Sequence, residues 1–233
     1  MASNDLPLGP AIDTTPAPRP GPVTLTGRTV LIEKLDPAKH ADGLWQVLKD
    51  DDSVWIYLAY GPFRERAAFD AWLAERAASA DPYFYAILDA QTRKPLGQFT
   101  LMEIRPAMRV IEVGNVLYSP ALQRTPAATE AQYLLARYAI DTLGYRRYEW
   151  KCNALNAPSR RAADRFGFTC EGTFRQHMII KGANRDTAWY SIIDKEWPAL
   201  RAAFETWLDP KNFDADGKQR VSLADLTRKR ATA

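Results

Sequence analysis

Residues 110–131 read VIEVGNVLYSPALQRTPAATEA. The run that ends at Tyr118 has the composition of a strand. A short loop separates it from small and apolar residues at the spacing of one helical face: Ala127, Ala131, Leu134, Leu135, Tyr138 and Thr142. Thr125 is the expected N-cap and Pro126 the first helical residue, where a missing N–H is no loss. A strand, a loop and a helix N-terminus in this order offer free N–H groups to a phosphate. Taken alone, the segment is equally consistent with an ordinary capped helix.

The expected phosphate donors are main-chain groups at the start of this helix. They are the N–H groups of Ala127, Ala128 and Thr129, with the guanidinium of Arg124 beside them. Glu130 lies close to the same helix start, where a carboxylate stabilises the helix dipole, and we expect that role rather than ligand binding. The segment therefore predicts an anion site with a basic side chain at its rim.

A second pattern follows in the C-terminal half of the chain. Residues 147–153, RYEWKCN, alternate polar and apolar and predict a half-buried strand. The sequence then reads Asn156-Ala-Pro-Ser159, continues with a helical run over 160–166 and stops at Gly167, after which Phe168 begins another strand.

Together the two segments resemble the acetyl-CoA-binding half of the GNAT acyltransferases, and in particular the ribosomal-protein N-terminal acetyltransferases. In that family the first loop carries Gln/Arg-x-x-Gly-x-Gly/Ala, commonly followed by Thr-Glu-Ala, and residues 123–131 read QRTPAATEA. The resemblance covers roughly residues 23–208, with further matches at 171–175, 181–182, 186, 190–193 and 196–197. It implies a single α/β (α+β) domain with a mixed, mostly antiparallel sheet of about seven strands and helices on both faces, which agrees with the order of expected elements.

The resemblance assigns cofactor roles to specific residues. Acetyl-CoA is the implied cosubstrate. Its pantetheine arm would lie along the strand 110–118 where this strand splays from the strand 147–153, with the thioester beside Gly114-Asn115-Val116. Val116 or Leu117 would polarise the thioester carbonyl through a backbone N–H. Asn156 would bond the cofactor arm, and Ser159 would protonate or orient the leaving thiolate; the alternative is an Asn N-cap with Ser159 in the first turn. The implied cofactor-binding set is Val116, Leu117, Gln123, Arg124, Ala127, Ala128, Thr129 and Asn156. Pro126 stands where the family usually has glycine and removes one donor, which predicts weaker or differently aimed phosphate binding.

The general base is less clearly marked. In the ribosomal-protein acetyltransferases a glutamate follows the Gly-Phe turn, but the register places Met178 there, with His177 beside it. Glu112 is the expected replacement, because GNAT enzymes often have a glutamate on this central strand, acting directly or through water; a solvent-facing strand residue is an equal alternative. His177 is a second candidate base, although a lone strand histidine is more often structural.

The acceptor site is expected at the first two helices and the loop between them. This loop holds Asp50-Asp51-Asp52, Trp55, Tyr57 and Tyr60, and acidic groups beside aromatic rings suit a cationic amine. A triple acid is nevertheless more often a solvated loop. Tyr118 and Tyr190 are further candidates for the acceptor pocket, with core filling as the alternative.

Composition limits the possible partners. The net charge of +3 is too small to indicate a nucleic-acid partner, and two cysteines give no disulfide framework and fit a reducing cytoplasm. Two histidines with no Cys or His cluster predict no metal site. No apolar stretch reaches membrane-spanning length, and no signal-peptide pattern begins the chain. A homodimer is possible and unspecified.

The chain divides into three parts. Residues 1–22 are rich in proline and predict a flexible arm, residues 23–208 form the domain, and residues 209–233 predict a polar, loosely packed tail. Within the domain we expect one strand over 24–35, a helix capped by Asp36-Pro37, a helix over 64–78, and an antiparallel meander of strands over 83–88, 96–104 and 110–118.

Two functional hypotheses follow. The first is an N-acetyltransferase that moves an acetyl group from acetyl-CoA to a primary amine, either a protein N-terminus or a small amine, by direct attack in a ternary complex. The second is a non-catalytic relative that binds CoA or a metabolite. The substitution at Pro126 and the missing downstream glutamate motivate the second hypothesis.

Overall fold

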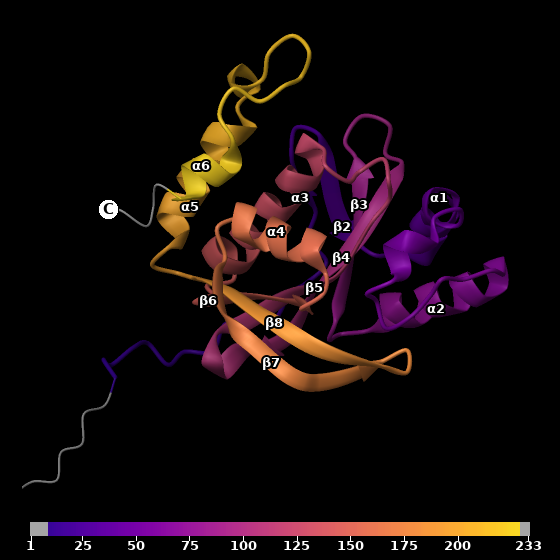
Figure 1. Ribbon diagram of the computed structural model, residues 1–233, viewed down its shortest axis with the longest axis horizontal. Coiled ribbons are helices and arrows are strands. Elements are labelled where there is room, and N and C mark those ends of the chain that lie inside the picture. Colours follow the sequence, from indigo (N-terminus) through magenta and orange to yellow (C-terminus); the bar gives the residue numbers. More distant parts are fainter. Residues whose placement is uncertain (1–8, 229–233) are drawn as a thin grey trace, which may run out of the picture.

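A single twisted sheet organises the chain in the computed structural model, which describes residues 9–228. Its eight strands lie in the order β1-β2-β3-β4-β5-β6-β8-β7, and only β5 and β6 pair in parallel (Figure 1). The strands are β1 Leu25–Thr26, β2 Val30–Lys34, β3 Tyr83–Asp89, β4 Pro95–Arg105, β5 Val110–Tyr118, β6 Arg147–Asn153, β7 Thr169–Ile180 and β8 Ala183–Ile193. The mixed, mostly antiparallel sheet was predicted; it has one more strand because the stretch expected as a single strand over 24–35 turns back on itself, with Gly27 N–H donating to Val30 C=O.

Helices cover both faces of the sheet, as predicted. They are α1 Pro37–Leu48, α2 Arg66–Ala78, α3 Pro126–Arg137, α4 Ala157–Arg165, α5 Trp197–Leu208 and α6 Leu223–Arg228, with short turns η1 Asp52–Trp55, η2 Pro106–Met108 and η4 Pro210–Asn212 and a π-helical continuation of α3, η3 Tyr138–Thr142. The local start signals act as expected: Asp36 caps α1 by accepting from Ala38 N–H at 3.0 Å, and Thr125 caps α3.

The two faces carry separate apolar cores. One core joins α1 and α2 to β2 and β3, with Leu44, Leu48, Phe69, Leu73 and Phe84 fully or almost fully buried. The other is larger and joins α3, α4 and α5 to the opposite face of the sheet. In Figure 1, α1 and α2 lie to the right of the sheet, whereas α3 and α4 lie over its other side.

Glu130 ties the first hairpin to α3. Its carboxylate accepts the backbone N–H groups of Arg28 at 2.8 Å, Thr29 at 2.7 Å and Val30 at 3.2 Å, and the Thr29 hydroxyl also donates to it. A Cβ on Gly27 would lie 2.6 Å from the carboxyl carbon of Glu130, so a larger residue here would displace the carboxylate from the turn. The expectation that Glu130 mainly serves the helix dipole was therefore incomplete, because its side chain reaches past the helix end to a turn that is distant in sequence.

The two terminal segments pack on the domain more than their composition indicates. Tyr85 hydroxyl donates to Gly21 C=O at 3.1 Å, Ala17 N–H donates to Pro106 C=O at 3.1 Å, and Ala17 is buried. After α5, helix α6 packs against α4 and α5 and buries Leu223 completely. The expectation of a loosely packed tail overlooked this helix, since a few apolar anchors are enough to hold a polar segment. Residues 1–8 of the predicted arm and 229–233 of the predicted tail lie outside the described part. Within residues 9–228, no helix has the length and apolar character needed to cross a membrane.

Candidate functional site

The strands β5 and β6 separate halfway along their length. Their parallel pairing runs from Val110 opposite Arg147 to Val113 opposite Trp150 and then stops, although both strands continue. Beyond Val113 the backbone of β5 has no strand partner on its β6 side among residues 9–228. On the β4 side, the pairing register shifts between Gln98 and Thr100, and Asn115 adopts a left-handed conformation with φ of 48°. This opening between the strands is the one that the resemblance implies for a pantetheine arm.

The loop before α3 offers fewer donors than predicted. Ala128 N–H is 3.2 Å from the Thr125 hydroxyl oxygen that caps the helix, so it is not free. Since α3 begins at Pro126, Thr129 N–H is the first donor used within the helix. Of the three predicted donors only Ala127 N–H makes no hydrogen bond within residues 9–228. The prediction of three free donors was wrong because it ignored the capping bond and the first helical bond.

Two polar side chains beside this loop also have partners. The Gln123 amide donates to Tyr118 C=O at 3.0 Å, so it braces the loop against the end of β5. The Thr129 hydroxyl accepts from the Arg165 guanidinium at 3.0 Å. Arg124 remains an exposed cation at the rim, with φ of 62°. Arg124 and Ala127 N–H are therefore the predicted groups that can meet an anion without first losing a bond.

Arg165 was not identified from the sequence. Its guanidinium lies 4.8 Å from the ring centroid of Trp207 and 5.4 Å from that of Phe166, and burial lowers its pKa. Through Thr129 it joins α4 to the first turn of α3, which fixes the two helices that flank the candidate cofactor loop. No local pattern marks this residue, because its partners come from three separate helices or their ends.

Asn156 and Ser159 make the contacts of a capped helix. Asn156 accepts Ser159 N–H at 3.1 Å, and the Ser159 hydroxyl oxygen accepts the indole N–H of Trp150 at 3.0 Å. Trp150 is the last β6 residue paired with β5, so Ser159 is held beside the point where the strands separate. The capping alternative is therefore realised, while the Ser159 hydroxyl is still placed next to the opening.

Glu112 and Lys151 meet on the sheet face opposite α3 and α4. Ile111 and Val113 point into the α3 side, so strand alternation directs Glu112 to the other side. Lys151 Nζ lies 2.7 Å from Glu112 Oε2, and the two side chains are only 10% and 6% exposed. Burial raises the pKa of Glu112 to about 7, with the Lys151 charge opposing the rise. A buried carboxylate with such a pKa is suited to accept a proton near neutral pH.

The other Glu112 oxygen lies beside Gly114. A Cβ added to Gly114 would come within 3.6 Å of Glu112 Oε1 and 2.2 Å of Met102 Sδ. The carboxylate therefore extends along β5 toward the unpaired stretch that begins at Gly114. This stretch is where the resemblance places the thioester.

A row of ion pairs continues from Lys151 across the same face. Lys151 Nζ is 3.2 Å from Glu149, which also binds Arg105 at 2.6 Å and Arg147 at 2.7 Å. Arg147 pairs in turn with Glu171. Burial acts to raise the pKa of Glu149, but the hydrogen bond from Arg147 and the neighbouring cations leave it below its ordinary value. Glu149 therefore serves as a fixed anion rather than as a proton acceptor.

His177 lies on this face but makes no direct contact with Glu112. Its Nδ1 is 3.0 Å from the Thr187 hydroxyl, and its ring packs edge-on against Phe174 and Trp189. Trp189 lies under Lys151, with Nζ 4.0 Å from the ring centroid. Lys151 and Trp189 thus separate the two candidate bases, and Glu112 is the one beside the strand opening.

The expected acceptor loop closes one edge of the open face. Tyr57 hydroxyl donates to Leu155 C=O at 3.2 Å, and Lys181 at the tip of the β7–β8 hairpin donates to Trp55 C=O at 2.9 Å. Tyr60, named in the sequence only as part of this loop, donates to Asn115 Oδ1 at 3.0 Å, and burial raises the pKa of its phenol. Asp51 caps η1 and Asp52 pairs with Arg64, which is the solvated-loop role expected for these acids.

Tyr118 and Tyr190 lie on the opposite side of the sheet from Glu112. Tyr118 accepts the Gln132 amide N–H of α3 at 2.8 Å, and Tyr190 accepts from Arg160 of α4 at 3.1 Å. Both pack with the core under α3 and α4. The structure does not bring them to the acceptor side. Tyr190 follows Trp189, which faces that side, so alternation directs Tyr190 away from it. In β5 the irregularity at Asn115, with φ of 48° and a shifted register against β4, reverses the alternation that would have placed Tyr118 on the Glu112 side.

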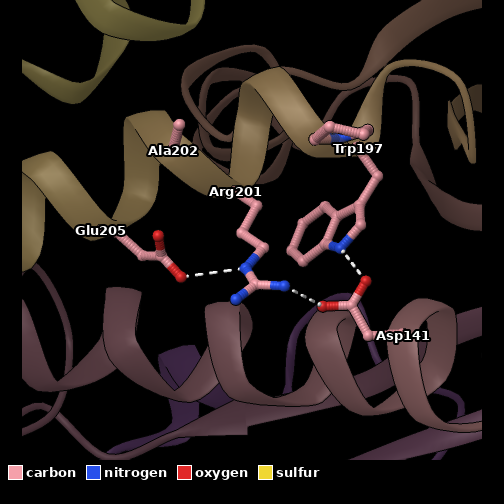
Figure 2. A pocket seen from close by; sticks show the side chains of 6 residues that line it. Asp141, Trp197, Arg201, Ala202 and Glu205 are labelled. Atoms are coloured by element: carbon pink, nitrogen blue, oxygen red, sulfur yellow. Dashed lines mark hydrogen bonds and ion pairs between the residues drawn. The ribbon is translucent and has the colours of Figure 1, made fainter.

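A surface hollow at α5 lies apart from these residues. Figure 2 shows its lining side chains, in which Arg201 bridges Asp141 at 3.2 Å and Glu205 at 2.9 Å, while Asp141 also accepts the Trp197 indole N–H at 2.7 Å. These polar groups satisfy one another. The hollow therefore has the features of a helix–helix contact and not of a reactive centre.

Among residues 9–228, no group of three or more His, Cys, Asp or Glu side chains is arranged to hold a metal ion. Cys152 is buried, Cys170 is exposed, and neither forms a disulfide.

Comparison with known proteins identifies relatives of this chain. The sequence model of the family described as "Acetyltransferase (GNAT) domain" matches residues 29–169. A crystal structure of a GCN5-related N-acetyltransferase from Brucella melitensis is 47% identical and covers 92% of this chain and 98% of that chain, with a TM-score of 0.89. A probable GNAT-family acetyltransferase from Chromobacterium violaceum is 40% identical over 84% of this chain and 100% of that chain, with a TM-score of 0.77. The "Putative ribosomal N-acetyltransferase YdaF" of Bacillus subtilis is 26% identical over 144 residues, which are 54% of this chain and 78% of that protein.

Proposed function

The chain belongs to the GNAT acetyltransferase family, and we propose on this basis that it transfers an acetyl group from acetyl-CoA to a primary amine. The amine attacks the thioester carbon directly in a ternary complex, CoA leaves as the thiolate, and no covalent enzyme intermediate forms. The observation that carries the proposal is the Glu112 carboxylate, held beside Gly114 where β5 and β6 separate. A base at this opening is what an amine needs to lose its proton on attack.

The residues would divide the work as follows. Arg124 and Ala127 N–H would bind the pyrophosphate, and Asn156 the cofactor arm. A backbone N–H of Val116 or Leu117 would polarise the thioester carbonyl, because negative charge develops on the carbonyl oxygen during the attack. Glu112 would take the amine proton directly or through water, and Ser159 would deliver a proton to the departing thiolate. His177 is not required in this scheme, since Lys151 and Trp189 stand between it and Glu112.

We propose a protein N-terminus as the first acceptor to test, with small amines second. The name of the Bacillus subtilis relative supports this order. An acceptor would approach Glu112 over the sheet face that the η1 loop and the β7–β8 hairpin border, where Tyr57 is exposed and Lys181 contacts Trp55 C=O. A cytoplasmic location and a homodimer remain predictions from the sequence.

Cofactor binding can be tested by titration calorimetry with acetyl-CoA. Arg124→Glu places a negative charge at the loop on an exposed side chain, so it leaves the core intact. Arg93→Glu is the matched control, because Arg93 is also an exposed arginine with φ of 62° but lies on the β3–β4 turn. We expect Arg124→Glu to weaken binding at least about tenfold, since a hydrogen bond to a charged group contributes about 1.5–3 kcal/mol. Equal affinities for both variants would refute the assignment of the loop.

Turnover decides between the enzyme and the non-catalytic alternative. Release of CoA thiol is followed with a panel of N-terminal peptides and small amines, and the acetylated product is identified by mass spectrometry. Product formation supports the transferase. Tight acetyl-CoA binding with no product from any acceptor would favour a CoA-binding relative.

A further inference from the structure

We propose that Lys151 is a positioning residue for the base: its ammonium holds the Glu112 carboxylate ionised and fixes which oxygen faces the reaction. This inference rests on the proposed function. It concerns a residue that the sequence did not single out and that lies on β6, not on the strand that carries Glu112.

The two oxygens of Glu112 have different surroundings. Lys151 Nζ binds Oε2 at 2.7 Å. Oε1 is the oxygen within 3.6 Å of the Cβ position of Gly114. One oxygen is therefore occupied by the ammonium, and the other points along β5 to the unpaired stretch where the thioester would lie. The ion pair therefore distinguishes Oε2 from Oε1 and favours the orientation in which Oε1 faces that stretch.

The ammonium is itself held from three sides. It contacts Glu112, it lies 3.2 Å from Glu149, and it sits 4.0 Å above the ring centroid of Trp189. Glu149 already has Arg105 and Arg147 as partners, so its charge is neutralised without Lys151. The Lys151 charge is thus available to Glu112, and its position is fixed by an anion and an aromatic face on the far side.

The other charged groups that face Glu112 cannot take over this role. On β6 they are Glu149 and Lys151, on β4 the nearest is Glu103, and on β8 it is Arg185. Both glutamates disfavour a second negative charge. Arg185 directs its Nε to the Thr187 hydroxyl at 3.2 Å. Lys151 is therefore the cation in direct contact with Glu112 among the described residues.

Removing the ammonium should favour protonated Glu112. Burial raises the pKa of Glu112, and Lys151 opposes that rise. An adjacent opposite charge typically lowers a carboxyl pKa by about one to three units. Glu112 acts as a base only in its carboxylate form. A higher pKa therefore depletes the active form at pH values below that pKa and leaves kcat/KM on the alkaline plateau unchanged. We therefore expect Lys151→Met to move the acidic limb of the kcat/KM profile upward by at least about one pH unit, so that activity near pH 6.5 falls about tenfold or more relative to pH 9.

The carboxyl group can be titrated without turnover. In protein labelled with carbon-13 at glutamate carboxyls, the Glu112 resonance is assigned as the signal missing from Glu112→Gln. We expect its titration midpoint to rise by at least about one pH unit in Lys151→Met and to return more than halfway in Lys151→Arg. Lys34→Met is the matched control, because Lys34 Nζ also lies 4.0 Å above a ring, that of Tyr83 on β3, but contacts no carboxylate in the described part of the chain. It should leave the midpoint unchanged.

The outcomes separate the two proposals. If the wild type transfers acetyl groups and the Lys151→Met variant keeps its thermal midpoint, an unmoved acidic limb and an unmoved carboxyl titration overturn the role of Lys151 alone. If the wild type shows no transfer to any acceptor, the proposed function fails whatever the titration gives, and the role of Lys151 as a partner of a catalytic base falls with it. A matched shift in both measurements supports the proposal.

Discussion

Replacing Glu130 by glutamine should destabilise the fold strongly although the side chain keeps its shape. Glu130 Oε2 accepts Thr29 N–H, the Thr29 hydroxyl and Val30 N–H, while Oε1 accepts Arg28 N–H. Glutamine retains one oxygen and places an NH2 group against donors on the other side. The loss of one charge-assisted hydrogen bond, worth about 1.5–3 kcal/mol, adds to the cost of placing the glutamine NH2 group against the N–H donors of the turn. We expect the free energy of unfolding to fall by about 2–4 kcal/mol.

The measurement is equilibrium urea unfolding followed by tryptophan fluorescence. Glu75→Gln is the control, because the Glu75 side chain is 70% exposed and pairs with neighbouring Arg76 on the surface; it should change the free energy of unfolding by no more than about 0.5 kcal/mol. Gly27→Ala gives a second test, since its Cβ would collide with the Glu130 carboxyl and should cost less in a Glu130→Ala background. A loss below about 0.5 kcal/mol for Glu130→Gln would show that the turn does not depend on the carboxylate.

Two further predictions concern the opening and the surface hollow. Gly114→Ala places a Cβ 2.2 Å from Met102 Sδ, and we expect the free energy of unfolding in urea to fall by about 1–3 kcal/mol. Adding Met102→Ala should restore stability but not the lost kcat/KM, so recovered activity in the double variant would contradict a thioester beside Gly114. Arg201→Met removes ion pairs on a half-exposed side chain; unfolding should change by less than about 1 kcal/mol with kcat/KM unaltered, and a large kinetic loss would instead assign the hollow to catalysis.

Local signals in the sequence predicted the fold well. The caps at Asp36, Thr125 and Asn156 act within a few residues of themselves, so their residue types suffice to place the starts of α1, α3 and α4. The meander β3–β4–β5 follows from alternation and from short connections. The helix α6 was missed because its packing depends on where α4 and α5 come together, which no local pattern encodes.

The site was only partly predictable for the same reason. Glu112 could be named, but Lys151 becomes its partner only through the parallel register that sets Glu112 opposite Glu149. A usable signal was present: alternation in 147–153 places Arg147, Glu149 and Lys151 on one face of a strand expected beside β5. Conversely, Tyr118 and Tyr190 were expected at the acceptor side from residue type alone. Alternation directs Tyr190 to the other face, and the irregularity at Asn115 does the same for Tyr118.

The short parallel pairing also bears on how the molecule holds together. Four residue pairs join β5 to β6, whereas antiparallel ladders link β1 through β5 on one side and β6, β8 and β7 on the other. The sheet is thus two antiparallel halves with a narrow joint, and forming that joint requires contacts distant along the chain, which slows folding relative to the local hairpins. A cofactor lying in the joint would contact both halves at once. The same interactions would then determine cofactor affinity and hold the two halves together. A bound ligand would bridge β5 and β6 over the part of their length where the strands do not pair.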